Sequence, residues 1–93
     1  MRYRTRYSKE ADHSLLRVPG NYRQRFRRII SELADDPEPT YSEALRGHPN
    51  RRKIKVDGWR LIYQVEPDTQ TLWILRIRLK TGPETYEGLD ALM

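Results

Sequence analysis

The sequence predicts an α+β domain in which a two-helix hairpin covers one face of a four-stranded, mainly antiparallel sheet. The first supporting observation is the stretch 51–65, where two alternating strands flank Asp57-Gly58, a dipeptide that favours the positive φ angles of a tight hairpin turn. The second is a pair of consecutive segments with helical spacing of apolar residues. Each has a single apolar stripe, so both helices are expected on the same face of the sheet. The length suits one domain, 1–93.

The first half of the chain predicts one strand and two helices. Residues 1–7 alternate between basic and uncharged side chains, which is typical of a half-exposed strand. Ser8 is a suitable N-cap for the first helix. The Pro-Gly pair at 19–20 ends that helix, and the second helix begins within 19–22 and ends before Pro37. The apolar stripe of the second helix consists of Tyr22, Phe26, Ile29, Ile30 and Leu33.

The second half of the chain predicts three strands. Residues 38–50 form a loop that Leu45 anchors in the core, and the hairpin 51–65 follows. Residues 71–79 form the last strand, and a short C-terminal helix or turn follows it. The side chains of that strand alternate between two sets, Trp73, Leu75, Ile77 and Leu79 on one face and Leu72, Ile74, Arg76 and Arg78 on the other. The element order is therefore β-α-α-β-β-β with an optional final helix.

Strand alternation gathers cations on the sheet face that points away from the helices, here named the cationic face. In the hairpin, Lys55 is expected to face Arg60, and Lys53 lies on the same side, opposite Ile62. The cations expected on this face are Arg2, Arg4, Arg6, Lys53, Lys55, Arg60, Arg76 and Arg78. No carboxylate from a strand interior is expected among them, so these like charges repel one another. The face therefore predicts a surface that binds an anion such as a phosphodiester backbone, with a merely solvated face as the alternative.

Composition limits the classes of function. The net charge of +5 favours a polyanionic or acidic partner. The chain has no cysteine, which excludes thiolate metal sites and disulfides. No apolar run reaches the length of a membrane span, and we expect a cytoplasmic protein without metal or cofactor. The two histidines are isolated: His13 lies on a predicted helix, and His48, in the loop before the hairpin, is a minor candidate for substrate contact.

The chemistry open to such a cationic cluster is metal-free cleavage of RNA by its own 2′-hydroxyl. Lys and Arg can neutralise the charge of the pentacoordinate phosphorus directly. A lysine could act as the base only if crowding lowered its pKa from about 10.4 toward neutrality, and an Arg, a Lys or Tyr86 could protonate the leaving 5′-oxygen. A good base for neutral pH is missing, so we expect little activity on free RNA. Another molecule is expected to hold the RNA in the position for attack.

Four segments carry a more specific pattern: Leu45-Arg46-Gly47, Lys53-Ile54-Lys55, the Trp-Arg-Leu-Ile-Tyr-Gln-Val run at 59–65, and Glu84-Thr85-Tyr86. Together they resemble the RelE branch of the RelE/ParE toxin superfamily, and the likeness in length and element order covers nearly the whole chain. The resemblance implies a type II toxin that cleaves mRNA in the ribosomal A site and so inhibits translation. It also implies a cognate antitoxin that holds the toxin inactive, with operator DNA as a further ligand of the complex through that antitoxin.

The resemblance further implies roles for individual residues. Lys53, Lys55 and Arg60 match active-site positions, with Lys55 as base or charge stabiliser and Arg60 holding the scissile phosphate. Tyr86 matches a C-terminal tyrosine that stacks on or orients a nucleotide. The late arginine of the family is replaced here by Lys80, so the cation at the transition state is either Arg78 or Lys80. Arg46 matches an arginine of the family that contacts substrate. The cationic face itself, and not the resemblance, suggests more general RNA contacts at Arg2, Arg4, Arg6 and Arg76.

Other functions stay open on the sequence alone. A ParE-like toxin would inhibit DNA gyrase without cleaving RNA, although the Lys-x-Lys pair argues against that branch. An inactive relative would only bind RNA. At the level of single residues, Arg60 could simply pair with Asp57 or Glu66, and Tyr86 could be a structural contact of the C-terminal turn.

Overall fold

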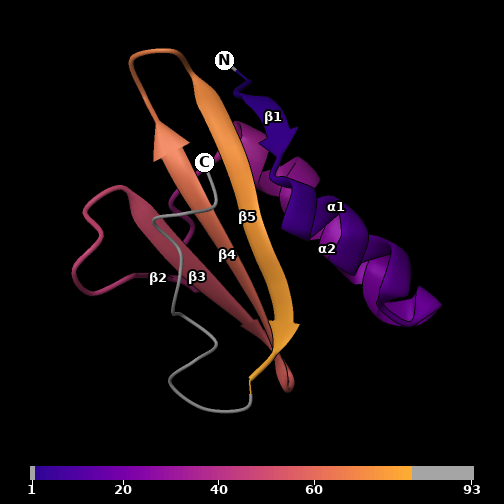
Figure 1. Cartoon of the computed structure of the whole chain (residues 1–93). Helices are drawn as coiled ribbons and strands as arrows, with labels where there is room; N and C mark the ends of the chain where they lie inside the picture. Colours follow the sequence, from indigo (N-terminus) through magenta and orange to yellow (C-terminus); the bar gives the residue numbers. More distant parts are fainter. Residues whose placement is uncertain (1, 81–93) are drawn as a thin grey trace.

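The computed structural model describes residues 2–80, which form one sheet with two helices packed against one of its faces (Figure 1). The elements are β1 (Arg4–Tyr7), α1 (Lys9–Arg17), α2 (Gly20–Asp35), β2 (Ser42–Ala44), β3 (Arg51–Val56), β4 (Trp59–Glu66) and β5 (Thr71–Leu79). The predicted α+β class and element order are confirmed, with one strand more than predicted. The predicted C-terminal helix or turn lies outside the described residues. No helix within 2–80 combines the length and apolar character needed to cross a membrane.

The strand order in the sheet is β1-β5-β4-β3-β2. The first strand pairs parallel with β5, whereas the other neighbouring strands are antiparallel. The additional strand, β2, lies within the segment 38–50 that the sequence predicts as a loop. Ser42 pairs with Ile54 and Ala44 with Arg52. A run of three residues carries no readable alternation, so pairing with β3, rather than local sequence, makes this segment a strand.

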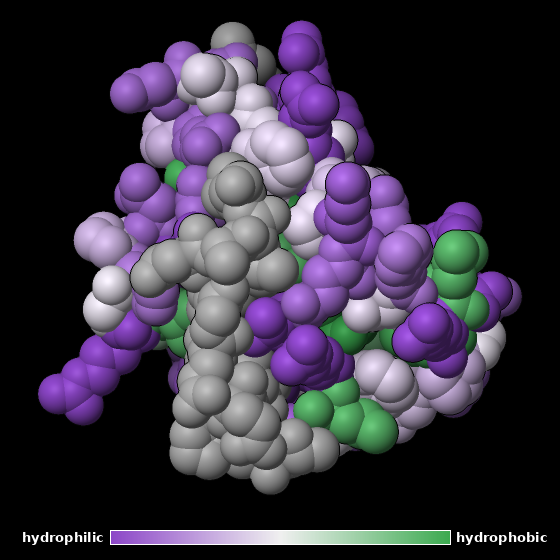
Figure 2. Space-filling view, in the orientation of Figure 1, coloured by the Kyte–Doolittle hydropathy of each residue, from purple (hydrophilic) through white to green (hydrophobic). Residues whose placement is uncertain are grey.

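The hydrophobic core lies between the sheet and the helices. The predicted stripe of α2 faces it, with Phe26, Ile30 and Leu33 buried, and Leu45 is buried as predicted. The sheet contributes residues from its three longest strands: Ile54, Val56, Leu61, Tyr63, Val65, Leu72, Ile74 and Ile77. Figure 2 looks onto the opposite, cationic face, where the described residues in view are mostly hydrophilic. Burial on one side thus leaves the other side of the sheet for polar function.

The hairpin has the predicted register, with Val56 opposite Trp59 and Lys55 opposite Arg60. Of the two turn residues, Asp57 alone adopts a positive φ, of 53°. The sequence predicted positive φ angles for the Asp-Gly pair, and the expectation for Gly58 is therefore wrong. The turn nonetheless keeps the two-residue length that fixes the register of the flanking strands.

The last strand departs from the simple alternation that the sequence predicts. Ile62 pairs with Arg76, but Tyr63 pairs with Ile74, so Leu75 is an extra residue without a partner on β4. An extra residue in one strand reverses which face the following side chains reach. The bulge therefore places both Ile74 and Ile77 in the core, and the prediction that they point to opposite faces is wrong.

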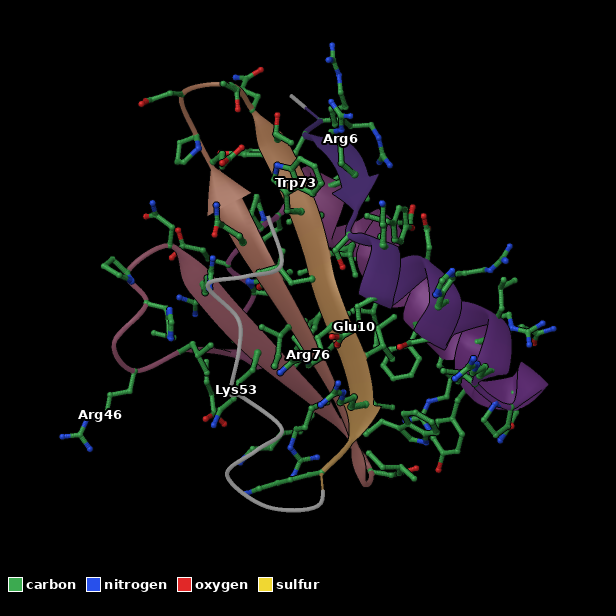
Figure 3. All side chains as sticks on the ribbon, in the orientation of Figure 1. Arg6, Glu10, Arg46, Lys53, Trp73 and Arg76 are labelled. Carbon is green, nitrogen blue, oxygen red and sulfur yellow. The ribbon has the colours of Figure 1, made fainter. Side chains whose placement is uncertain are left out.

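The first turn of α1 is fastened to β5. Ser8 caps the helix as predicted, since its hydroxyl accepts from the Ala11 amide at 3.0 Å and donates to the Leu75 carbonyl at 2.7 Å. This contact brings Glu10 to Arg76 (Figure 3), where the Arg76 Nε donates to Oε2 at 2.5 Å and Nη2 donates to Oε1 at 3.2 Å. Only 4% of Arg76 is exposed, so the pair is a buried link between helix and sheet.

Replacing Glu10 with alanine is expected to lower the free energy of unfolding by about 3 kcal/mol, because the buried Arg76 charge loses its carboxylate on α1. Chemical denaturation measures this loss. Asp12→Ala is the matched control, since Asp12 lies in the same first turn and interacts with the same helix dipole. Equal losses in the two variants would contradict a structural role for the ion pair.

Candidate nucleic-acid interface

Three cations from three strands lie side by side on the cationic face. Lys55 on β3 pairs across the sheet with Arg60 on β4, and Arg60 pairs with Arg78 on β5. Their Cα atoms are therefore separated by about 5 Å from one strand to the next. We name Lys55, Arg60 and Arg78 the cation row. The prediction that Lys55 and Arg60 share a face is confirmed. Next to the cation row, Lys53 and Arg76 lie on either side of Ile62 on the same face of the sheet.

The guanidinium of Arg60 is held by the hairpin turn. Its Nη1 donates to the carbonyls of Asp57 at 3.0 Å and of Trp59 at 2.8 Å. Its Nε is buried and has no hydrogen-bond partner among the described residues. An unsatisfied buried donor costs free energy, and a functional role is one explanation for such a group. Arg60 therefore combines a guanidinium fixed by the turn with a buried donor that no described residue satisfies.

The carboxylates that could have neutralised Arg60 are engaged elsewhere. Asp57 Oδ2 accepts from the Tyr22 hydroxyl at 2.7 Å and from Arg25 Nη1 at 3.1 Å, which ties the hairpin turn to α2. Glu66 accepts from Gln64 and Trp73, both at 3.2 Å. The structure thus shows Arg60 bound to main-chain carbonyls and not to the side chains of Asp57 or Glu66.

The link between the turn and α2 has a consequence for acid stability. The hydrogen bonds from Tyr22 and Arg25 hold the pKa of Asp57 below its ordinary value of 3.8. A lowered pKa in the folded state stabilises the protein above the unfolded-state value, and this contribution disappears as the pH falls through the folded-state pKa.

We therefore expect Asp57→Asn to be less stable than the parent protein near neutral pH, with the difference shrinking as the pH falls below about 4. Asparagine tolerates the positive φ of this position, so the turn is retained. Thermal unfolding of both proteins over a pH series measures the difference. A difference in melting temperature between the two proteins that stays constant into the acid range would contradict the assigned role of the Asp57 charge.

Within residues 2–80, two carboxylates that reach the cations of this face are Glu43 and Glu10. Glu43 on β2 lies 3.6 Å from the Lys55 ammonium and 3.9 Å from that of Lys53. Glu10 on α1 lies 3.5 Å from the Arg78 guanidinium. Glu43 is the middle residue of its strand, so the prediction that no strand-interior carboxylate joins the cations is wrong. The cause is β2 itself, because its pairing with β3 places Glu43 directly opposite Lys53.

The other predicted residues are spread around this centre. Arg4 and Arg6 lie on β1, and the Arg6 guanidinium stacks 5.2 Å from the centre of the Trp73 ring. Arg2 precedes β1 and pairs with Asp35 at the end of α2, 2.7 Å away, so it does not join the cationic face. Arg46 points away from the sheet (Figure 3).

The two remaining predicted active-site residues follow β5. Lys80 is exposed, and its amide donates to the Gly58 carbonyl at 2.9 Å, beside the hairpin turn. Tyr86 lies outside the described residues.

The sequence interpretation missed three residues beside the predicted site. Arg51 is the first residue of β3 and shares the alternation of Lys53 and Lys55, a signal that was available in the sequence. Glu10 and Glu43 had no such signal, because their positions depend on contacts between distant segments. No cluster of three or more metal-ligating side chains lies within residues 2–80. The described site is thus built from cations and single carboxylates.

Comparison with known proteins identifies the family. Residues 5–80 match the family model described as the ParE toxin of the type II toxin–antitoxin system parDE. The chain belongs to the ParE toxin family. The predicted membership of the RelE/ParE toxin superfamily is thereby confirmed, and the chain is a toxin of a type II toxin–antitoxin system. No curated protein matches it in sequence.

Solved structures share the fold of this ParE-family chain. One is an E. coli RelE toxin carrying two arginine-to-alanine substitutions, in the free state, with a TM-score of 0.84, 23% identity and full coverage of both chains. The RelBE toxin–antitoxin complex of E. coli gives a TM-score of 0.78 at 22% identity, covering 86% of this chain and 99% of that chain. The RelE–RelB complex of Pyrococcus horikoshii gives 0.76 at 22% identity, covering 87% and 98%.

Proposed function

We propose that this ParE-family toxin is a metal-independent endoribonuclease that cleaves mRNA in the ribosomal A site and thereby inhibits translation. The observation that carries the proposal is the cation row, in which Lys55, Arg60 and Arg78 come from three adjacent strands and face the same side. Three cationic side chains whose Cα atoms are about 5 Å apart can supply positive charge to one phosphodiester group at the moment when it gains negative charge. Such an enzyme would act in the cytoplasm, where ribosomes are found.

The proposed reaction is attack of a ribose 2′-oxygen on the adjacent phosphorus. A bond forms between the 2′-oxygen and phosphorus, the bond to the 5′-oxygen breaks, and the proton lost by the first oxygen is balanced by one gained by the second. Arg60 holds the phosphate through its fixed guanidinium, and Lys55 and Arg78 neutralise the charge that develops on the other oxygens. Arg78 is the better placed of the two late cations, because Lys80 lies beyond the end of β5.

Glu43 supplies the base that the sequence interpretation lacked. Its carboxylate lies within 4 Å of both lysine ammonium groups at the edge of the cation row. Both lysines are therefore ion-paired with Glu43, and their ammonium groups suit them to holding phosphate oxygens. A carboxylate beside the scissile phosphate can accept the 2′-hydroxyl proton at neutral pH. The leaving 5′-oxygen would take its proton from Lys80 or Tyr86.

Lys55 and Glu43 are open to solvent, and for this reason the proposed reaction requires the ribosome. More than half of the Lys55 and Glu43 side chains is exposed, at 53% and 56%. An open site cannot by itself hold a flexible RNA with its 2′-oxygen in line with the phosphorus, and a second macromolecule must position the RNA. A ribosome that fixes the codon supplies it. We therefore expect free RNA to be cleaved slowly or not at all.

A cognate antitoxin is the expected protein partner. Several of the similar solved structures are RelE toxins in complex with RelB antitoxins or a RelB peptide, and this chain shares their fold. With a net charge of +5, it would favour an acidic partner that covers cations and so blocks RNA. Any contact of the complex with operator DNA would be made through the antitoxin.

The alternative is inhibition of DNA gyrase without RNA cleavage, the activity expected of a ParE-like toxin, and it is weighed because the chain matches the ParE family model. A direct comparison decides between the two. The purified toxin is added to a translation reaction with a reporter mRNA, whose cleavage sites are mapped by primer extension, and to a gyrase supercoiling reaction. Codon-aligned cleavage that requires ribosomes supports the proposal. Loss of supercoiling with intact mRNA overturns it, and ribosome binding with neither effect would identify an inactive relative.

A further inference from the structure

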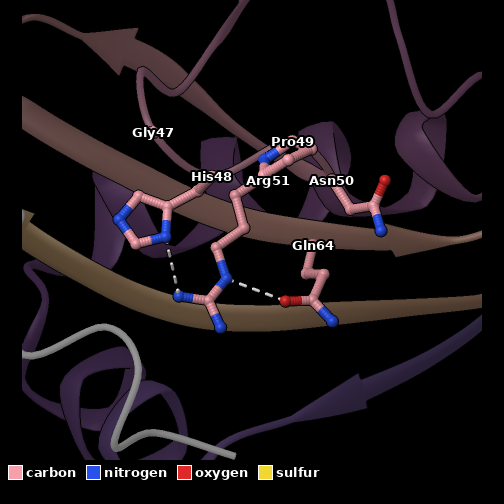
Figure 4. Close-up of a pocket in the computed structure, with 6 residues that line it drawn as sticks. All are labelled: Gly47, His48, Pro49, Asn50, Arg51 and Gln64. Carbon is pink, nitrogen blue, oxygen red and sulfur yellow. Dashed lines mark hydrogen bonds between the residues drawn. The ribbon is translucent and has the colours of Figure 1, made fainter.

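A pocket of about 280 Å³ adjoins the cationic face at the end of β3 that is far from the hairpin turn (Figure 4). The residues that line it are Gly47, His48, Pro49, Asn50, Arg51 and Gln64. Its position is notable because Arg51, Lys53 and Lys55 alternate along one strand and so reach the same face. The pocket therefore lies about 13 Å along the strand from the cation row.

The loop that forms one wall is fixed by its own hydrogen bonds. The Leu45 amide donates to the Arg51 carbonyl at 2.8 Å, and the Arg51 amide donates to the His48 carbonyl at 3.0 Å. Gly47 has a φ of 82°, a backbone conformation that glycine adopts without strain and other residues rarely adopt. These contacts hold the His48 ring beside Arg51 and give the pocket its shape before any ligand binds.

The floor of the pocket is a chain of hydrogen bonds between side chains. Arg51 Nε donates to Gln64 Oε1 at 2.8 Å, and Gln64 Nε2 donates to Glu66 at 3.2 Å. The second oxygen of Glu66 accepts from the Trp73 indole at 3.2 Å. His48 Nδ1 lies 3.5 Å from Arg51 Nη1 on the other side. The guanidinium plane is thus set from two directions, with a flat imidazole next to it.

A flat ring and a fixed guanidinium suit one class of ligand in particular. Single-stranded RNA is recognised by stacking of its bases on aromatic rings and guanidinium planes, and by pairing of its phosphates with arginine. The pocket is polar and open, which fits a nucleotide better than an apolar molecule. Its distance from the cation row along β3 places it where the same RNA strand would continue.

We propose that this pocket binds a nucleotide of the mRNA that lies near the cleaved bond but is not adjacent to it, with the base against the His48 ring and the phosphate paired with Arg51. The assignment rests on the proposed function for the course of the RNA, but the pocket itself can be tested without ribosomes. Its consequence is a preference for particular nucleotides near the cleavage site, set by residues outside the cation row.

The test is titration of the purified full-length toxin with each of the four 5′-nucleoside monophosphates, followed by NMR of the His48 ring and the Gln64 side-chain amide. The parent protein should show saturable shifts of both signals. His48→Ala and Arg51→Gln should each weaken binding about tenfold or more, the loss expected for a charge-assisted hydrogen bond or a stacked base. Arg28→Gln, which removes one exposed positive charge from α2, is the control and should bind as the parent does.

Three results would overturn the assignment. Shifts confined to residues of the cation row would place the nucleotide elsewhere, and identical shifts with inorganic phosphate would leave only an anion site. Unchanged binding in both pocket variants would remove His48 and Arg51 from it. Because no ribosome is present, these results are independent of whether the toxin cleaves mRNA. If it does, Arg51→Gln should also raise KM more than it lowers kcat and reduce the differences in cleavage between codons.

Discussion

Replacing Arg60 with alanine is expected to lower ribosome-dependent mRNA cleavage by about 100- to 1,000-fold, the effect of removing one fixed donor to the charge of a transition state. Arg60 is the central member of the cation row, with Lys55 and Arg78 as its neighbours on either side. The carbonyls of Asp57 and Trp59 hold its guanidinium in place, so the positive charge at the centre of the row is fixed before RNA binds. Neither neighbour can supply that charge from its own strand.

The Arg60 variants can separate a catalytic from a structural effect. Arg60→Lys keeps the charge but loses the planar fork of donors, and its activity should lie between those of the parent and the alanine variant. Arg28→Ala removes an exposed charge from α2 and should cleave as the parent does. The measurement is the rate of cleavage of a reporter mRNA on purified ribosomes, together with the melting temperature of each variant. Full activity of Arg60→Ala would remove this residue from the reaction.

Replacing Glu43 with glutamine should lower the rate of cleavage by about 100- to 10,000-fold, the range for loss of a general base. The same change should strengthen binding to RNA, because it removes a negative charge 3.6 Å from Lys55 and 3.9 Å from Lys53. These opposite effects distinguish the base from a carboxylate that only screens its neighbours. If Glu43 only screened charge, the variant would bind more tightly and cleave at least as fast.

A matched carboxylate on the helical side serves as the control for this residue. Glu32→Gln removes an exposed carboxylate from α2 and should leave both the rate of cleavage and RNA binding as in the parent protein. Equal losses of activity in the Glu43 and Glu32 variants would assign the base to another group.

The roles proposed for Lys55 and Arg60 leave the second arginine or lysine at the transition state to be assigned. The sequence left Arg78 and Lys80 as alternatives, and the two differ in their surroundings. Arg78 lies within β5 opposite Arg60 and is contacted by Glu10 at 3.5 Å, whereas Lys80 follows the strand. A cation held by a carboxylate on a helix keeps its position without substrate, which favours Arg78 in a preorganised site.

Local patterns were sufficient for much of this protein. The turn at Asp57 and the alternation on either side of it set the hairpin register, and this register alone places Lys55 beside Arg60. The stripe of α2 predicted Phe26 and Leu33 in the core, where they are fully buried. Such features can be predicted because they depend on the spacing of residues within one element and on the chemistry of one turn.

The tertiary structure decided what depends on pairing between distant segments. The strand β2 has too few residues to show a period, and only its register against β3 brings Glu43 to the lysines. The bulge at Leu75 has no local signal, yet it determines which side chains of β5 reach the core. The buried pair of Glu10 and Arg76 likewise joins residues 66 positions apart. The sequence thus determined where the cations gather, and long-range packing determined which carboxylates meet them, because a side chain's partners across a sheet follow from strand pairing and not from its neighbours in the chain.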